Sequence, residues 1–576
     1  MLIGILSLVL GNVASILAAR SLLRLCPSGQ PHVDVVLFLI LRLAVLSGAV
    51  LVAGLSSILN RYALGLAATA ATGLFLAFSA NRVMPKIRFP AWAWPIWLAL
   101  TVLCLRVLAQ VWFLAPYNHD ALSYHLPKIA EWVRAGSFTH EMGLDTHVSL
   151  PAGYELIETW WVLFLEHDVL IEMAGVEFLV LAFASVYALA THLGLAPTGA
   201  CLAGLFYVLT PGLQLQATGG LNDGAVASCV TATFALVATR APLGPSALAA
   251  GLGMGIKGTF LYAVPGIVLL EVLARKQSRQ SSGPQAAKFG LITCALWIGL
   301  FWYLRNVAWF GNPIYPLGSQ GLVGGTGQER IQLGLSFESG VRNVASLFAR
   351  VINDVRLPQS PLLPGAAGWG LVCVLLGGIG LVIGLRRNHA LGTLVLALAA
   401  SFVSVLFLVR HDPWNFRFVL FFPVLFSLGI AYLPWSKLPI QIALILAGGW
   451  MVWSSTFPAE VRPEGMLHLA RLGWGERSWA RVVGPDLPPG PVAFYVNELV
   501  SRRGEAYLLY GPDFSREVVY LRPWKGEGIL EVMDRRNVRV LCVSRTSALP
   551  DSLVERAAEA GFLRPLGPRL YERDSP

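Results

Sequence analysis

Long apolar runs separated by short polar segments constrain the fold of this chain more than any other feature. A helix needs about 20 apolar residues to cross the core of a bilayer, and many of the runs approach that length. The chain is 55% hydrophobic and only 13% charged, whereas a soluble domain carries about 25% charged residues. The sequence therefore predicts an α-helical polytopic membrane protein with about 14 transmembrane helices. The runs lie near residues 2–19, 35–59, 62–81, 92–115, 170–193, 197–212, 224–240, 245–256, 258–273, 289–310, 367–385, 391–409, 415–433 and 438–455.

Basic residues between the runs predict how the helices are oriented. Lysine and arginine favour the cytoplasmic side of a membrane, so the basic clusters are expected to share one side. They do so if residues 151–165 lie in the membrane interface, a position that suits Glu155 and Glu158 on a helix ending in tryptophans. The run 245–273 must also break at Lys257 into two half-length helices. The clusters are Arg20 and Arg24; Arg82, Lys86 and Arg88; Arg275, Lys276, Arg279 and Lys288; and Arg386 and Arg387.

This orientation brings several polar residues to the external face. Asp120, Asp223, Lys257 and Arg417 all fall there, together with the segment 311–316. Apart from Lys257, where the break is placed, none of these residues enters the choice of orientation. Their convergence predicts a functional site on the external, periplasmic face of an inner or plasma membrane. The N-terminal run lacks a basic n-region and is expected to be a retained span with an external N-terminus.

The composition divides the chain into three regions. Residues 1–91 are expected to be additional N-terminal transmembrane helices, and 92–456 a central transmembrane module with external loops at 116–169 and 311–366. Residues 457–576 are richer in charge and proline and alternate strand-like with helix-like segments, which predicts a small external α/β domain. That domain carries no GxGxxG or Walker motif, so we expect a docking or lid domain. Its strand-like segments are 492–497, 506–510, 517–521 and 538–543, and its helix-like segments include 528–535 and 551–561.

The net charge of +10 does not indicate nucleic-acid binding. The basic residues are scattered in small groups between apolar runs, an arrangement that suits lipid headgroups and the positive-inside bias. The seven cysteines form no CxxC pair, so neither a zinc site nor a disulfide framework is indicated. Membrane lipid is therefore the predicted partner, and nucleic acid is not.

Asp120 is the first candidate for a chemical role. It heads a helix-like segment, 121–135, in which Tyr124, Lys128 and Trp132 follow on one face. An aspartate at this position can cap the helix by accepting backbone N–H bonds. It can also act as a base, since a carboxylate that accepts cap bonds still accepts a proton. The residues alone leave both interpretations open.

Three further residues are candidates on chemical grounds. Asp223 precedes a span and, by itself, is explained by a helix cap. Lys257 interrupts an apolar run, where a lysine is costly and usually functional, although its side chain can also snorkel to the interface. Arg417 begins a span among aromatic residues, which suits either lipid headgroups in general or a bidentate contact with one phosphate.

Histidines in the first external loop raise the question of a metal site. His119, His125, His140 and His147 lie there with Glu141. Histidine is a common metal ligand, but no HExxH motif or comparable spacing is present. We therefore keep His119 and His140 only as weak candidate ligands, and a divalent cation stays open as a cofactor.

Taken in order along the chain, these segments resemble the GT-C superfamily of polyprenyl-phosphate-sugar-dependent glycosyltransferases. The likeness is greatest to family 39 and the RgtA/B/C/D-like group, which are related to protein O-mannosyltransferases and lipid A aminoarabinose transferases. It covers roughly residues 92–455 and rests on the order of the segments. Many relatives have two adjacent acids where His119 and Ala121 flank Asp120 here. The segments are HDALSYHLPKIAEW, SLPAGYELIETWW, NDGAVAS, AAGLGMGIKGTF, GNPIYP and WNFRFVLFFPVLF.

The resemblance implies transfer of a sugar from a polyprenyl-phosphate donor to a hydroxyl of a glycan, lipid or protein acceptor, with inversion. Asp120 would be the general base, and Asp223 would position the acceptor or orient Lys257. The cations Lys257 and Arg417 would bind the donor phosphate. Such a donor needs no nucleotide site, which agrees with the absence of a nucleotide motif in the sequence.

Further substrate contacts are expected from Tyr124, His125, Glu155 and Tyr315. Two other classes of protein stay open. An O-antigen ligase or polymerase-like enzyme would use several loop arginines, and 328–356 contains four. A lipid-linked oligosaccharide flippase or transporter would need inverted repeats or broken helices around a midplane cavity. The sequence shows no internal repeat, and its polar residues gather at one face rather than midway.

Overall fold

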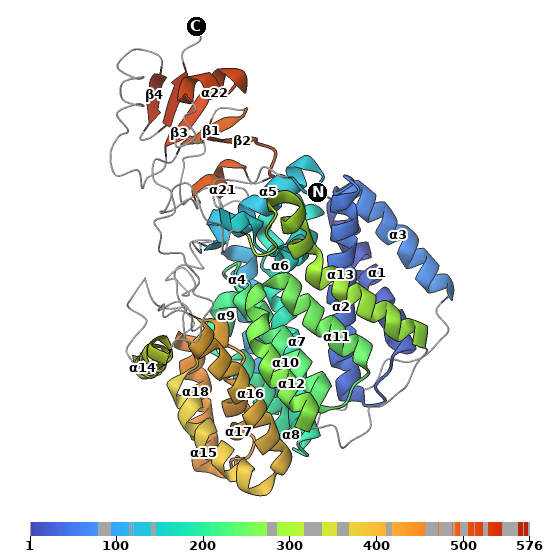
Figure 1. Cartoon of the computed structure of the whole chain (residues 1–576), viewed down its shortest axis with the longest axis vertical. Coiled ribbons are helices and arrows are strands. Elements are labelled where there is room, and N and C mark those ends of the chain that lie inside the picture. The colour runs from blue at the N-terminus through green and yellow to red at the C-terminus, as the bar shows by residue number, and fades with distance from the viewer. Residues whose placement is uncertain are drawn as a thin grey trace.

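The computed structural model has a large helical body and a small sheet domain at one end (Figure 1). Most of the apolar runs fold as one helix or as two. The structure describes residues 2–78, 94–114, 116, 118, 120–139, 146–273, 285–315, 337–353, 368–409, 417–454, 471, 487, 490–495, 505–511, 513–521, 528–543, 563–567 and 570–573.

The helical body contains long helices and shorter ones between them. The long helices are α1 (Leu2–Leu25), α2 (Pro31–Leu55), α3 (Arg61–Phe78), α4 (Trp94–Phe113), α7 (Met173–His192), α10 (Asp223–Ala238), α13 (Gln285–Phe310), α14 (Phe337–Asn353), α15 (Leu371–Arg387), α16 (His389–Leu408) and α18 (Leu438–Ser454). The shorter ones are α5 (Leu126–Ala135), α6 (Gly153–Leu163), α8 (Pro197–Val208), α9 (Pro211–Ala217), α11 (Leu243–Ile256), α12 (Val264–Leu273) and α17 (Val424–Ile430). In Figure 1, α7 and α10 to α12 run through the middle of the body, between α1 to α3 and α15 to α18.

Several of these helices are suited to cross a membrane. Among the described residues, α1, α2, α4, α7, α13 and α16 are the six whose length and apolar composition suffice by themselves. The pair α8 and α9 adds a seventh candidate, a span bent by 64°. The apolar helices α10, α11, α12 and α18 are shorter. The chain is therefore a multi-pass membrane protein, and the number of about 14 spans stays a prediction.

The expected break at Lys257 is confirmed. Helix α11 ends at Ile256, Lys257 has an extended backbone with φ −162° and ψ 140°, and a 3₁₀ turn, η5 (Gly258–Ala263), leads into α12. Small residues fix the position of this break, because they let backbones approach closely. A Cβ atom on Gly153 of α6 would lie 2.7 Å from the carbonyl carbon of Gly255. Helix α6 therefore contacts the end of α11 directly before Lys257.

Helix α6 packs against other helices of the protein, and its predicted position at the membrane interface stays a prediction. All of its residues are buried, and they contact α2, α7 and α11. Glu155 and Glu158 therefore face other helices instead of lipid headgroups. An apolar helix with a few acids looks the same in the sequence whether protein or lipid surrounds it.

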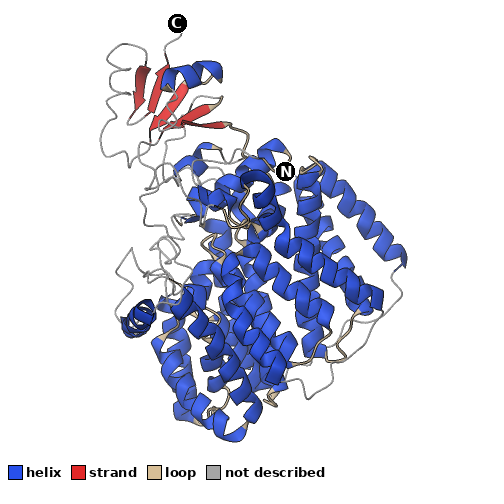
Figure 2. Cartoon of the chain, viewed as in Figure 1, coloured by secondary structure: helices blue, strands red, loops and turns tan. Residues whose placement is uncertain are grey.

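The C-terminal part folds as a five-stranded sheet in the order β2-β1-β3-β5-β4. Strands β2 and β3 run parallel to β1, whereas β5 runs antiparallel to β3 and β4. Figure 2 shows the sheet at one end of the helical body. The predicted small α/β domain is confirmed in its class. Its elements are β1 (Val492–Tyr495), α21 (Glu505–Leu509), β2 (Val518–Leu521), α22 (Ile529–Arg535), β3 (Val540–Val543), β4 (Leu563–Gly567) and β5 (Leu570–Arg573).

One strand prediction in this domain is wrong and two strands are missed. Residues 506–510 form most of the helix α21 and its end, because Ala506, Leu509 and Tyr510 turn together toward one apolar cluster. Strands β4 (LRPLG) and β5 (LYER) contain proline, glycine and charged residues, and proline, glycine and glutamate are depleted in strands. The predicted helix 551–561 lies outside the described residues.

Candidate functional site

Asp120 precedes a π-helical turn, η2 (Ala121–His125), which continues into α5. Its backbone is helical and its side chain forms no cap bond, so the helix-cap interpretation does not describe this carboxylate. The backbone N–H of Asp120 donates to Oδ1 of Asn118 at 3.1 Å. Single π-helical turns are frequent at functional sites. The Asp120 carboxylate is thereby left for other partners.

Four charged side chains from distant parts of the chain meet in one row. Arg417 Nη1 lies 2.7 Å from Asp120 Oδ2, and its Nε lies 3.2 Å from Asp223 Oδ2. Lys257 Nζ lies 2.7 Å from Asp223 Oδ1 and also donates to Asn222 Oδ1 at 3.1 Å. The charges alternate in the order Asp120, Arg417, Asp223, Lys257. We call these four residues the charge row.

Each member of the charge row is placed by its local backbone. The extended backbone of Lys257 interrupts the broken helix, and Asp223 opens α10. Before Asp223, Gly220 adopts φ +60°, which favours glycine. A Cβ atom there would lie 3.0 Å from Cβ of Ala121. The turns that carry Asp120 and Asp223 therefore pack directly against each other.

An aromatic ring lies beside the two cations of the row. Lys257 Nζ is 5.2 Å from the ring centroid of Phe418, and Cζ of Arg417 is 5.5 Å from it. Cation–π contacts of this length stabilise a desolvated cation. Phe418 thus helps to hold two like charges close together.

The charge row is accessible at three of its four members. The side chains of Asp120 and Arg417 are 25% and 21% exposed, and that of Lys257 is 15% exposed. Burial would by itself raise the pKa of Asp120, but Arg417 overcomes this effect and holds the pKa well below its usual range. Asp120 is therefore an anion at neutral pH and, while paired with Arg417, a weak base.

A second charged cluster lies buried on α5, η2 and α6. Glu155 Oε1 accepts from Lys128 Nζ at 2.6 Å and lies 2.9 Å from His125 Nδ1. Burial disfavours ionisation of Glu155, yet Lys128 and His125 lower its pKa to about 2. Burial lowers the pKa of both Lys128 and His125, and Glu155 opposes that shift. The cluster joins the helix after Asp120 to α6.

Glu158 belongs to the same region but forms no ion pair with any of the described residues. Both of its carboxylate oxygens are buried without a hydrogen-bond partner. Burial, and then the negative charge of Glu155, raise the pKa of Glu158 well above its usual value. A carboxyl group in such a place is held in its neutral, protonated form.

Replacing Glu158 with glutamine is therefore expected to stabilise the protein increasingly as the pH rises. Because the folded-state pKa is raised above the unfolded value near 4.5, the contribution of Glu158 is fully present below that value and is lost as the pH rises through the folded-state pKa. Glutamine does not ionise. The difference in apparent Tm, variant minus wild type, should widen between pH 5 and pH 8. Glu531→Gln, at an exposed position of α22, is the control. A difference that narrows with pH would contradict this assignment.

The other predicted site residues lie in different places. Tyr124 is half-buried beside His125, with ring centroids 4.3 Å apart, and it acts electrostatically on Arg417. Tyr315 stacks on Phe310 at 4.1 Å, and its carbonyl accepts from Asn306. Residues 311–315 of the predicted segment 311–316 are thus held by α13, and residue 316 lies outside the described residues. No contact between Tyr315 and the charge row is seen among the described residues.

The proposed metal ligands are not placed by the structure. His119 and His140 lie outside the described residues. Within the part of the chain that is described, no group of three or more histidine, cysteine, aspartate or glutamate side chains is arranged to hold a metal ion.

Sequence reasoning missed Asn222, the buried carboxyl of Glu158, and the pairing of Lys128 with Glu155, although Glu155 itself was predicted as a substrate contact. Lys257 donates hydrogen bonds to both Asn222 and Asp223. The only sequence signal for Asn222 was its position directly before Asp223. Lys128 and Glu155 are 27 residues apart, so no local spacing connects them. The signal for Glu158 was its position one turn after Glu155 in a helix that is otherwise almost wholly apolar.

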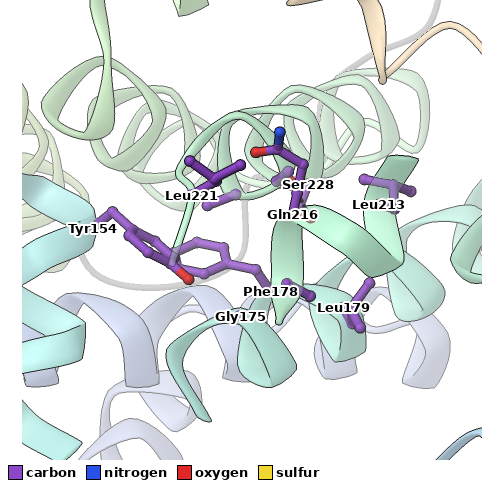
Figure 3. A pocket seen from close by; sticks show the side chains of 11 residues that line it. Tyr154, Gly175, Phe178, Leu179, Leu213, Gln216, Leu221 and Ser228 are labelled. Atoms are coloured by element: carbon purple, nitrogen blue, oxygen red, sulfur yellow. Dashed lines mark hydrogen bonds between the residues drawn. The ribbon is translucent and has the colours of Figure 1, made fainter. Parts of the chain in front are cut away.

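A small cavity lies behind the turn of Asp223 (Figure 3). Tyr154, Gln216 and Leu221 contribute to its lining, and Gln216 Oε1 also accepts from the backbone N–H of Asp223 at 3.1 Å. Its volume of about 10 Å³ is close to that of one water molecule. This cavity is therefore too small for a sugar or a lipid chain.

Comparisons with known proteins bear on the fold. No protein-family model matches the sequence, and no curated protein matches it. Among solved structures, the chain is similar to ArnT from Cupriavidus metallidurans bound to undecaprenyl phosphate, with 15% identity, a TM-score of 0.51, and coverage of 84% of this chain and 98% of that one. The apo structure of ArnT gives 13% identity and a TM-score of 0.50 with the same coverage. The likeness shows the ArnT fold and confirms the fold that the GT-C resemblance implied.

Proposed function

We propose that this protein is a membrane glycosyltransferase that moves a sugar from a polyprenyl-phosphate-linked donor to an acceptor hydroxyl. The reaction would take place on the external face of the inner or plasma membrane, with inversion. The observation that carries the proposal is the partly exposed charge row, in which two cations lie beside one carboxylate that is free of cap bonds. The likeness to ArnT, whose structure holds undecaprenyl phosphate, supports this class of lipid.

The charges of the row suit a phosphate ligand. At rest its two carboxylates balance its two cations. In the described part of the chain, Arg417 Nε and Asp223 Oδ2 form an ion pair at 3.2 Å, but neither atom has a hydrogen bond. A phosphate oxygen that binds this N–H group therefore displaces no hydrogen bond described here. Charge-assisted bonds from arginine to phosphate are strong and directional. A donor phosphate between Arg417 and Lys257 would therefore compete with the carboxylates for the same cations.

This competition links donor binding to activation of the base. When Arg417 turns toward the phosphate, its contact with Asp120 at 2.7 Å is weakened. The pKa of Asp120 then rises toward its usual range, because the main cause of its depression is removed. Asp120 becomes a better proton acceptor when the donor is in place, which disfavours activation without substrate.

The reaction itself is a single displacement at the anomeric carbon. The acceptor hydroxyl oxygen forms a bond to that carbon while its proton passes to Asp120. The bond between the anomeric carbon and the phosphate oxygen breaks, and its electron pair stays on the phosphate. Lys257 and Arg417 stabilise the added negative charge of the polyprenyl phosphate product. Asp223, bound to Lys257 at 2.7 Å, orients that lysine.

The remaining candidates take supporting places in this proposal. Tyr124, half-buried near Arg417, is the best placed to contact the substrate. His125 and Glu155 are buried and would act by holding the turn after Asp120. The alternative of a ligase-like enzyme draws little support from α14, where Arg342 is exposed and pairs with Glu338 on the same helix.

Binding of undecaprenyl phosphate to the purified protein in lipid nanodiscs tests the proposal. A ligand at about 100 times its Kd stabilises a protein by about 2.7 kcal/mol, so the apparent Tm should rise with the lipid concentration. Undecaprenol, which has the same chain without the phosphate, is the control and should have a much smaller effect. Equal stabilisation by both lipids would contradict a phosphate site.

A further inference from the structure

The C-terminal domain packs on the part of the helical body that carries Asp120. One apolar cluster contains residues of both parts. Within it, α21 contacts η2 and α5, and Phe494 of β1 and Leu509 of α21 are fully buried. The helical body contributes Ala121, Leu126, Ile129, Ala130, Val162 and Ile171. Figure 1 shows α21 lying between the sheet and α5.

This cluster includes both ends of the π-helical turn. Ala121 begins η2 directly after Asp120, and Leu126 follows its last residue. Both side chains are completely buried. A π-helical turn is rarer than an α-helical one and needs support from its surroundings. Here part of that support comes from the C-terminal domain.

Two buried tyrosines fix the orientation of this contact. The Tyr510 hydroxyl donates to Glu131 Oε1 of α5 at 2.8 Å, and the Tyr507 hydroxyl donates to Asp168 Oδ2 at 3.0 Å. Both tyrosines and both acids are at most 5% exposed. Hydrogen bonds to charged groups are stronger than neutral ones and more directional than apolar contacts. They fix where the domain sits on α5 and beside α6.

We propose that the C-terminal domain positions the Asp120 turn for catalysis, with Tyr510 and Tyr507 as positioning residues. Neither tyrosine touches the charge row. Tyr510 acts through Glu131 of α5, whereas Tyr507, through Asp168 beside α6, holds α21 in its place against α5 and η2. The geometry of η2 sets where the Asp120 carboxylate points relative to Arg417. The catalytic part of this inference rests on the proposed function, whereas the support of η2 by the domain does not.

Tyr510→Phe tests the proposal in the full-length protein, with two readouts. Hydrogen exchange of residues 121–135 should become about 10-fold to 100-fold faster, since the hydrogen bond to Glu131 is lost together with the one between the Tyr510 and Tyr520 hydroxyls. Exchange of α22, on another part of the domain, should stay unchanged. The kcat for sugar transfer should fall about 10-fold, while KM for the lipid-linked sugar stays within about 2-fold, because its phosphate site is intact.

Tyr571→Phe is the matched control, since Tyr571 lies in the same domain but in a different apolar cluster. It should change neither readout. Tyr507→Phe removes the hydrogen bond to Asp168 and should have the same effect as Tyr510→Phe. Agreement of the two variants would show that the effect does not come from misfolding of one of them. Unchanged exchange of 121–135 in both variants would overturn the proposal, and so would faster exchange with an unchanged kcat. If the wild type transfers no sugar, the proposed function fails, and the exchange measurement still decides whether the domain supports the turn.

Discussion

Replacing Asp120 with asparagine is expected to lower kcat about 10²-fold to 10⁴-fold, the usual contribution of a positioned general base. Asparagine keeps the shape of the side chain but accepts no proton from the acceptor hydroxyl. The same change frees Arg417 from its 2.7 Å contact with Asp120. The affinity for the lipid-linked donor should therefore stay the same or increase. The substitution is thus expected to lower kcat without weakening donor binding.

The measurement is single-turnover transfer of a labelled sugar by the purified protein, together with the donor Kd. Asp513→Asn is the matched control, because Asp513 is an exposed loop aspartate that bonds only to nearby Ser515 in the described structure. Its turnover should equal that of the wild type. Intact turnover in Asp120→Asn would show that Asp120 is not the base.

Replacing Lys257 with glutamine is expected to weaken donor binding by about 30-fold or more. Loss of one partner of a buried, hydrogen-bonded charge pair costs about 2 to 5 kcal/mol, and 1.36 kcal/mol corresponds to a tenfold change. Asp223 is only 2% exposed and loses its nearest cation, so some loss of stability accompanies the effect. The binding assay with undecaprenyl phosphate measures the first effect, and apparent Tm without lipid measures the second.

Lys437→Gln, at an exposed position outside the row, controls for a general loss of positive charge near lipid. Its binding should be unchanged. Arg417→Lys provides a second comparison, because it keeps the charge but loses the fork that reaches both Asp120 and Asp223. Binding that is equally strong in wild type and Lys257→Gln would remove Lys257 from the phosphate site.

The sequence predicted much of the helical body because apolar runs of sufficient length leave few alternatives in a membrane. The break at Lys257 was predictable because a lysine inside an apolar membrane helix is costly. The distribution of basic residues predicted that Asp120 and Arg417 lie on the same face of the membrane. Only the structure shows that their side chains lie 2.7 Å apart. No local pattern measures a contact between residues 297 positions apart.

Other features were beyond sequence reasoning for physical reasons. The burial of Glu155 and Glu158 among other helices was not predicted, because a sequence pattern reports apolar surroundings and does not tell protein from lipid. The segment of α21 was expected to be a strand because Tyr507 and Tyr510 favour strands, whereas packing on α5 decides its structure. The support of the Asp120 turn by the C-terminal domain depends on that same contact.

A structure of the protein with undecaprenyl phosphate bound tests the central claim most directly. The account predicts that the phosphate group lies between the Lys257 ammonium and the Arg417 guanidinium, within hydrogen-bond distance of both, with the Asp120 carboxylate facing it and its ion pair with Arg417 lengthened from 2.7 Å. A phosphate bound elsewhere, with the charge row unchanged, would contradict the account.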